Sequence, residues 1–198
     1  MDFKKFLPWI IVAVLVIFGI SSYNGLVEVQ ADTKTAWSKV ESSYQRRNDL
    51  IGNLVKTVQG AADFEKSTLT AVIEARSKAT SVTIDPANIT PEQLAQFQQA
   101  QSGLTSSLSR LLVSVEQYPE LKANQNFLEL QSQIEGTENR INVERDRFND
   151  AANIYDKKTR SFPTVLFAKL FGFGEIARFK AEAGAEKAPD IEFNFDKK

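Results

Sequence analysis

The stretch that decides the architecture of this chain is FLPWIIVAVLVIFGI, residues 6–20. It carries no charge, and with Ser21, Ser22 and Tyr23 it forms an apolar run of roughly eighteen residues, close to the length that crosses a hydrocarbon core. We therefore predict a transmembrane helix over residues 6–23, in contact with membrane lipid. Trp9 and Tyr23 then serve as membrane anchors near the two interfaces, where amphipathic rings are favoured.

The residues that flank this run predict its orientation. Lys4 and Lys5 precede it, whereas the sequence that follows is mixed in sign. The positive-inside rule then places the N-terminus in the cytoplasm and the rest of a single-pass inner (plasma) membrane protein outside. A cleaved signal peptide is the alternative, because Gly19-Ile20-Ser21 offers small residues at a cleavage position. The run is long for a signal peptide, so we expect it to be retained.

The composition excludes most catalytic chemistry. The 198 residues include no Cys and no His, which removes disulfides, thiol and Ser-His nucleophiles and the two commonest zinc ligands. Lys and Arg total 24 against 25 Asp and Glu, so no excess of positive charge points to nucleic acid. No glycine-rich phosphate-binding motif occurs. We expect no enzyme activity, no cofactor, no metal and no nucleic-acid partner.

The body of the chain has the pattern of long helices. Val27 to about Thr80 contains no Pro, and apolar or large residues recur near the three-four spacing of a helix seam. These residues are Trp37, Val40, Tyr44, Ile51, Leu54, Val58, Ala61, Leu69 and Val72. The pattern predicts a helix of roughly 80 Å, broken at most once, with Gly52 and Gly60 as its weakest points or closest helix contacts.

Two more helices follow a turn at Asp85-Pro86. Thr90-Pro91-Glu92-Gln93 supplies an N-cap, a Pro at the first helical position and a Gln that closes a capping box. The second helix then runs to Pro119, with one polar seam position at Gln101, and a third runs from Leu121 to Arg160. Short connections make successive helices antiparallel, so we predict an all-α, four-helix-like bundle of three long helices and one short one.

The sequence after Phe162-Pro163 is unusually apolar from Thr164 to Gly174. Three destinations stay open for it: a short fourth helix that closes the bundle, a contact with another subunit, or a position against the membrane. The candidate interaction residues are Leu166, Phe167, Leu170, Phe171 and Phe173. Further on, residues 189–196 alternate apolar and polar, which suits an extended segment or an added strand, with a frayed end as the alternative.

Two polar sets lie among the seam positions of the first and third helices. They are Arg46, Arg47, Asp49 and Asn53, and Glu135, Glu138, Asn139 and Arg140. If they face each other they form a structural polar layer, which fixes helix register more than it adds stability. A catalytic role for Glu135 or Glu138 as general base lacks a positioned substrate, and a di-metal site of the usual Glu-x-x-His kind lacks its His.

The sequence resembles the LemA family in several blocks between residues 23 and 174. They are residues 23–27, 36–41, 45–55, 118–127, 137–141 and 147–149, followed by Phe162-Pro163 and residues 171–173. The resemblance implies a bacterial membrane protein with an N-terminal span, an antiparallel four-helix-like bundle and no established enzyme activity. Gly52 stands where the family commonly has Pro. Family members have both topologies, and many are encoded beside membrane zinc peptidases or stress proteins.

We divide the chain into a cytoplasmic N-terminus (1–5), the span (6–23), the LemA-like bundle (24–174) and a C-terminal tail (175–198). The leading hypothesis is a membrane-anchored scaffold that assembles into homo-oligomers, because we expect a helix of roughly 80 Å to be too long for its own bundle to cover. The alternative is an accessory or chaperone-like subunit of a membrane protease, such as a zinc peptidase, or of an envelope stress system.

Overall fold

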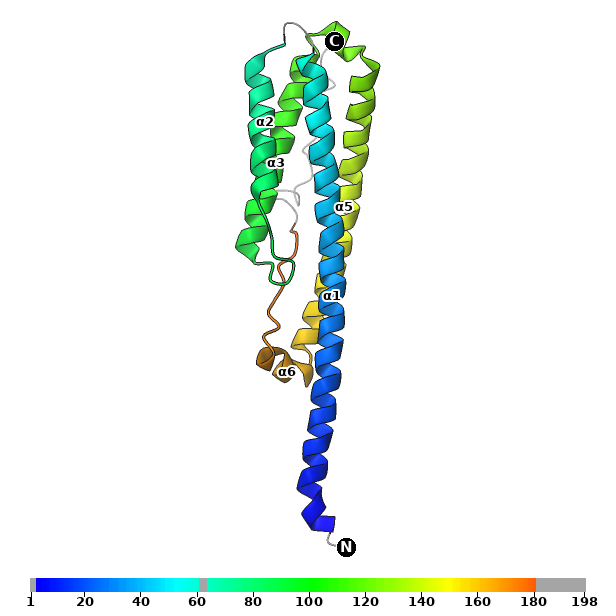
Figure 1. Cartoon of the computed structure of the whole chain (residues 1–198), viewed down its shortest axis with the longest axis vertical. Helices are drawn as coiled ribbons and strands as arrows, with labels where there is room; N and C mark the ends of the chain where they lie inside the picture. Colours follow the sequence, from blue (N-terminus) through cyan, green and yellow to red (C-terminus); the bar gives the residue numbers. More distant parts are fainter. Residues whose placement is uncertain (1–2, 61–63, 181–198) are drawn as a thin grey trace, which may run out of the picture.

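The structure is a computed structural model, and it describes residues 3–60 and 64–180 of the chain. Six helices lie in these ranges (Figure 1). They are α1 (Phe3–Gln59), α2 (Lys66–Ser81), α3 (Pro91–Val115), α4 (Pro119–Lys122), α5 (Gln125–Arg160) and α6 (Thr164–Leu170). The all-α prediction is confirmed, with a long N-terminal apolar helix that continues into the bundle.

The apolar run and the first bundle helix are one element. α1 has 57 residues without a break, so at 1.5 Å per residue it extends about 85 Å. Its N-terminal part projects alone from the bundle, and its C-terminal part lies among the other long helices (Figure 1). No joint separates residues 6–23 from the core-forming residues that follow.

The predicted break falls at Gly60. α1 ends at Gln59 and α2 begins at Lys66, so the expected helix from Val27 to Thr80 is two antiparallel helices. Gly52 lies inside α1 and marks a close contact instead, because an added Cβ there would lie 3.2 Å from Cζ of Arg76 on α2.

The helix starts follow their capping residues. The capping box at α3 is present: Thr90 Oγ1 accepts from the Gln93 amide at 3.2 Å, and Gln93 Oε1 accepts from the Thr90 amide at 3.1 Å. The single helix expected from Leu121 is wrong at its start. α4 ends at Lys122 and α5 begins at Gln125, because Asn124 Oδ1 accepts from the amides of Asn126 and Phe127 and caps a new helix.

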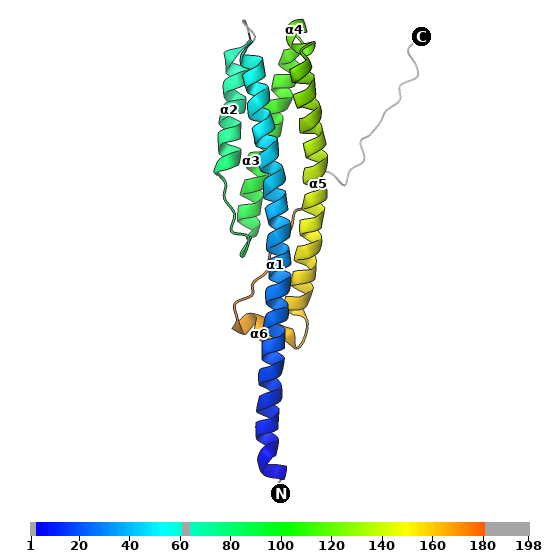
Figure 2. The ribbon, with the colours of Figure 1, turned by 45° about the vertical axis from the view of Figure 1, so that its right-hand side comes forward.

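The bundle is built from two antiparallel helix pairs. α1 packs along α5 and α2 packs along α3, and the two pairs lie face to face (Figures 1 and 2). Their shared interior contains two hydrophobic clusters, one around Ile51, Leu104 and Ile134 and the other around Trp37 and Phe148. The seam of α1 is buried from Leu26 to Val58, so the expectation that part of it lacks cover is wrong for this stretch.

The chain returns along the bundle after α6. Residues 173–180 have no helical structure, yet Ile176 and Phe179 are buried in the cluster around Trp37. Asn149 holds this return segment by two hydrogen bonds to Phe179, donating Nδ2–H to its carbonyl oxygen and accepting from its amide. Sequence reasoning missed this role by assigning residues 175–180 to a tail. The alternating stretch 189–196 lies outside the described residues.

Candidate functional site: an apolar end and an internal polar layer

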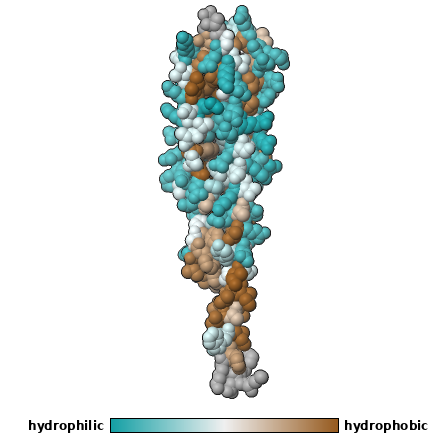
Figure 3. Space-filling model, viewed as in Figure 1, coloured by the Kyte–Doolittle hydropathy of each residue, from teal (hydrophilic) through white to brown (hydrophobic). Residues whose placement is uncertain are grey.

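The N-terminal part of α1 is an apolar surface without protein cover. Its large side chains from Phe6 to Ile20 are all exposed, and an 18-residue window here has a mean hydropathy of 2.2 with 6% of it buried. Among the described residues, α1 is the one helix long and apolar enough to cross a membrane. Figure 3 shows hydrophobic surface gathered over this part of α1 and around α6, and a mainly hydrophilic bundle beyond.

The predicted anchors lie toward the two ends of this surface. Trp9 is exposed near its start. Tyr23 lies past its end, where its ring packs edge-on against Phe171 and Phe173, with centroids 5.1 and 6.0 Å apart. The spacing along α1 therefore separates the two amphipathic rings by most of the apolar run.

The candidate interaction segment lies beside the end of the apolar run. The Phe167 ring is 5.6 Å from that of Phe18, and an added Cβ at Gly19 would lie 3.1 Å from it. Ala168 is the one buried residue of α6, whereas Leu166 and Leu170 point outward and are 61% and 75% exposed. α6 therefore packs on α1 and on the end of α5 and leaves an apolar face uncovered.

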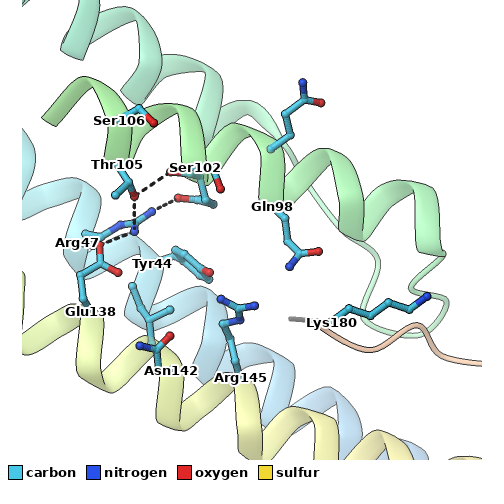
Figure 4. Close-up of a pocket in the computed structure, with 13 residues that line it drawn as sticks. Tyr44, Arg47, Gln98, Ser102, Thr105, Ser106, Glu138, Asn142, Arg145 and Lys180 are labelled. Carbon is cyan, nitrogen blue, oxygen red and sulfur yellow. Dashed lines mark hydrogen bonds and ion pairs between the residues drawn. The ribbon is translucent and has the colours of Figure 1, made fainter. Parts of the chain in front are cut away.

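Arg47 forms the centre of a polar layer between the two hydrophobic clusters. Its guanidinium pairs with Glu138 on α5 at 2.6 Å, and it donates to Gln101 and Thr105 on α3 (Figure 4). The same group lies 4.9 Å from the centre of the Tyr44 ring. Arg47, Gln101 and Glu138 each stand between apolar seam residues of their own helix, so the layer ties α1, α3 and α5 together at one level.

The structure places the other predicted layer residues outside this layer. Arg46, Asp49, Asn53, Glu135, Asn139 and Arg140 are all exposed. Asp49 pairs loosely with Arg76 at 3.7 Å, and Glu135 accepts from Gln131 one turn away. Neighbouring helix positions point about 100° apart, so Arg47 enters the bundle while Arg46 faces solvent. Gln101 was expected as a polar seam residue, and Thr105 was missed.

A polar groove of about 600 Å³ opens beside the layer, between α1, α3 and α5. Tyr44, Arg47, Glu138, Arg145 and Lys180 lie along it (Figure 4). Burial raises the pKa of Tyr44, while the neighbouring Arg145 and Arg47 oppose that rise. The described residues contain no group of three or more His, Cys, Asp or Glu side chains placed to hold a metal ion.

The sequence is similar to those of several known proteins. The sequence model of the LemA family matches residues 36–193, which covers the bundle and the return segment. The chain belongs to the LemA family. Its relatives include the magnetosome protein MamQ 2 of Paramagnetospirillum magneticum, 26% identical over an alignment of 181 residues that covers 83% of this chain and 66% of that protein.

Two further relatives are similar at the same level. The magnetosome protein MamQ of Magnetospirillum gryphiswaldense is 26% identical over 79% of this chain and 64% of its own length. Protein LemA of Metamycoplasma hominis is 26% identical over 80% of this chain and 68% of its own length. The chain thus spans slightly less than two thirds of the MamQ proteins that it matches.

Proposed function

We propose that this LemA-family chain is a membrane-anchored helical scaffold without catalysis of its own. The observation that carries the proposal is the apolar, uncovered part of α1, which continues as a single helix into the buried core. Such a helix transmits the orientation of the anchor to the bundle without a flexible joint. The bundle is then held at a fixed angle to the bilayer, and its outer faces are available to partners.

A charge in the span tests the anchor. Arg at the centre of a transmembrane helix opposes insertion by roughly 2.5–3.5 kcal/mol, so we expect a V14R/L15R double variant to leave the membrane fraction after alkaline extraction. The matched control is V143R, because Val143 is an equally apolar and exposed residue on the bundle helix α5. Retention of the double variant in the membrane would contradict the anchor.

The orientation follows from Lys4 and Lys5, which we propose lie on the cytoplasmic side. A phosphatase that folds only outside the cytoplasm, fused after Lys198, is then active, and a cytoplasmic reporter at the same position is silent. The reverse pattern would place the bundle in the cytoplasm.

Self-association is the finer part of the proposal. What supports it is a shallow groove on α2 and α3. Four small residues, Ala71, Ala75, Ala100 and Gly103, lie in it among polar and charged side chains such as Glu74 and Arg110. Small side chains let a helix of a second copy approach closely. A Cβ at Gly103 would meet nothing within 4 Å, so G103L fills the groove without disturbing the fold. We expect it to reduce crosslinking between copies in native membranes.

Ser77 provides the matched control for that experiment, because it is exposed on α2 and does not line the groove. S77L adds a similar side chain and leaves crosslinking unchanged. Crosslinks that survive in G103L would locate the contact elsewhere. A peptidase recovered in equal amount from the same membranes would favour the accessory-subunit alternative.

A further inference from the structure

An uncovered apolar face lies at the base of the bundle, outside the span itself. It consists of Phe162, Leu166, Leu170 and Phe171, all exposed, on α6 and the residues that flank it. Single exposed apolar residues are normal on a protein surface, but four within ten positions form a patch. We call these four residues the α6 face.

The position of the α6 face relative to the span is fixed by ring contacts. Phe167 lies against Phe18 and Gly19, and Phe171 lies against Tyr23. Residues 18–23 are where the apolar run of α1 ends and the polar bundle begins. The α6 face is therefore at the level at which a bilayer that surrounds residues 6–20 would end.

Basic side chains lie at the end of α5 and in α6, close to this level in the chain. Lys157, Lys158 and Arg160 occupy the last turn of α5, and Lys169 lies in α6. Lys158 lies over α1, since a Cβ added at Gly25 would meet its Nζ at 2.8 Å. Arg160 pairs with Glu175 at 2.7 Å, whereas the three lysines have no ion pair within the described part of the chain. Lys169 lies on the helix that carries the α6 face, and the two other lysines lie at the end of the helix that precedes it.

We propose that the α6 face inserts into the interfacial layer of the same bilayer that α1 spans, with Lys157, Lys158 and Lys169 at anionic lipid headgroups. The inference rests on the anchor proposed above, because the span sets the depth of α6. Apolar side chains in the acyl boundary below lysines at the phosphates are the arrangement of an interfacial helix. The proposal makes α6 a second membrane contact, which resists tilting of the long bundle.

The absence of cysteine from the chain permits a direct test. Single-cysteine variants L166C and L170C of the full chain are labelled with an environment-sensitive fluorophore and reconstituted into vesicles of phosphatidylcholine and phosphatidylglycerol. L15C reports on the span, and V113C reports on an exposed apolar position of the bundle. We expect lipids with a quencher near the headgroup to quench L166C and L170C severalfold more than V113C, and aqueous iodide to do the opposite.

The controls separate the two proposals. If L15C is not quenched from lipid, the anchor itself is wrong. If L15C is quenched while L166C and L170C stay open to iodide, the anchor stands and the interfacial role of α6 is overturned. Labels shielded from both quenchers, with disulfide crosslinks between copies of the unlabelled variants, would also overturn it and assign the face to a second copy.

A separate measurement tests the contact between the lysines and the lipid headgroups. Replacing phosphatidylglycerol by phosphatidylcholine, or introducing K157E, K158E and K169E together, is expected to reduce lipid quenching at L170C. K122E, at an exposed lysine of α4 at the other end of the bundle, is the control and leaves it unchanged. Equal quenching in both vesicles and in the triple variant would overturn the role of the lysines.

Discussion

The two partners of the central ion pair differ in their access to water. Arg47 is 3% exposed, whereas Glu138 is 37% exposed. A buried charge without its partner is costly, but a carboxylate at the surface regains solvent when its partner is removed. The two halves of the pair are therefore not equivalent, although both contribute to the same 2.6 Å contact.

This asymmetry predicts unequal effects on the free energy of unfolding. We expect E138L to destabilise the bundle by about 3 kcal/mol, because it leaves Arg47 charged and buried, and R47M to cost only about 1–2 kcal/mol. The double variant should be more stable than E138L. Urea unfolding of the full chain in mild detergent measures all three, with E135L on the exposed face as the control.

An E135L variant as unstable as E138L, or a double variant with strictly additive losses, would contradict the role of the layer. Additive losses would mean that the two side chains do not interact energetically.

Two buried tyrosines predict a loss of stability at alkaline pH. Burial raises the pKa of Tyr155, with a further rise from the neighbouring Asp156, and burial also raises the pKa of Tyr44 above the ordinary value of 10.0. Above about pH 10 the unfolded chain releases these protons and the folded chain keeps them, so the free energy of unfolding falls as pH increases. Below that pH both states are protonated and the two groups add no slope.

The urea midpoint measured on either side of about pH 10 checks this expectation. Y44F/Y155F is the control and should lose the tyrosine part of the decline. The Tyr155 hydroxyl has no hydrogen-bond partner in the described part of the chain, so its removal is expected to be neutral or stabilising near neutral pH. An unchanged alkaline decline in the double variant would assign the effect to other groups.

At the scale of single elements, the sequence predicts best where the signal is local. The α3 capping box could be read directly, because all its bonds join Thr90 and Gln93. The end of α1 beside Gly60 could be predicted from the sequence in the same way. Asn124 was missed because an Asn is a common loop residue, and only the local backbone decides whether its side chain caps a helix. The rotation of a helix about its own axis decides that Arg47 is buried and Arg46 is exposed. That rotation depends on the neighbouring helices, so the sequence of one helix does not predict it.

The capping box predicts a measurable contribution to stability. T90A removes the hydroxyl that accepts from the Gln93 amide, so we expect a loss of about 1 kcal/mol in the free energy of unfolding. T70A in α2 is the control, because the Thr70 hydroxyl is exposed and bonds only to the carbonyl one turn earlier. Equal losses in the two variants would indicate that the cap adds nothing beyond helix propensity.

At the scale of the whole molecule, two features depend on contacts that no local pattern reveals. The apolar run of residues 6–20 and the first bundle helix form one continuous helix, although the sequence predicts each of them separately. The return segment brings Phe179 against Trp37 and Phe148, at 5.9 and 5.7 Å between ring centroids, from more than thirty positions away along the chain. The spacing of apolar residues reveals which face of a helix is buried. It does not reveal that a distant extended segment packs across that face. The interior around Trp37 is therefore completed by residues of the segment that the sequence analysis assigned to a tail.

Phe179 tests whether the return segment belongs to the folding unit. Its ring packs against both Trp37 and Phe148 and lies 4.5 Å from the guanidinium of Arg145, so F179A opens a cavity in the core. We expect a loss of about 3 kcal/mol, as for other buried Phe to Ala changes. In a W9F background Trp37 is the sole tryptophan, and its emission should shift to longer wavelength as water enters. K180A, at the exposed neighbouring position, should change neither quantity. If F179A keeps the stability and the emission of the parent chain, the segment rests on the bundle without supporting it, and α1, α3 and α5 alone must hold the Trp37 cluster closed.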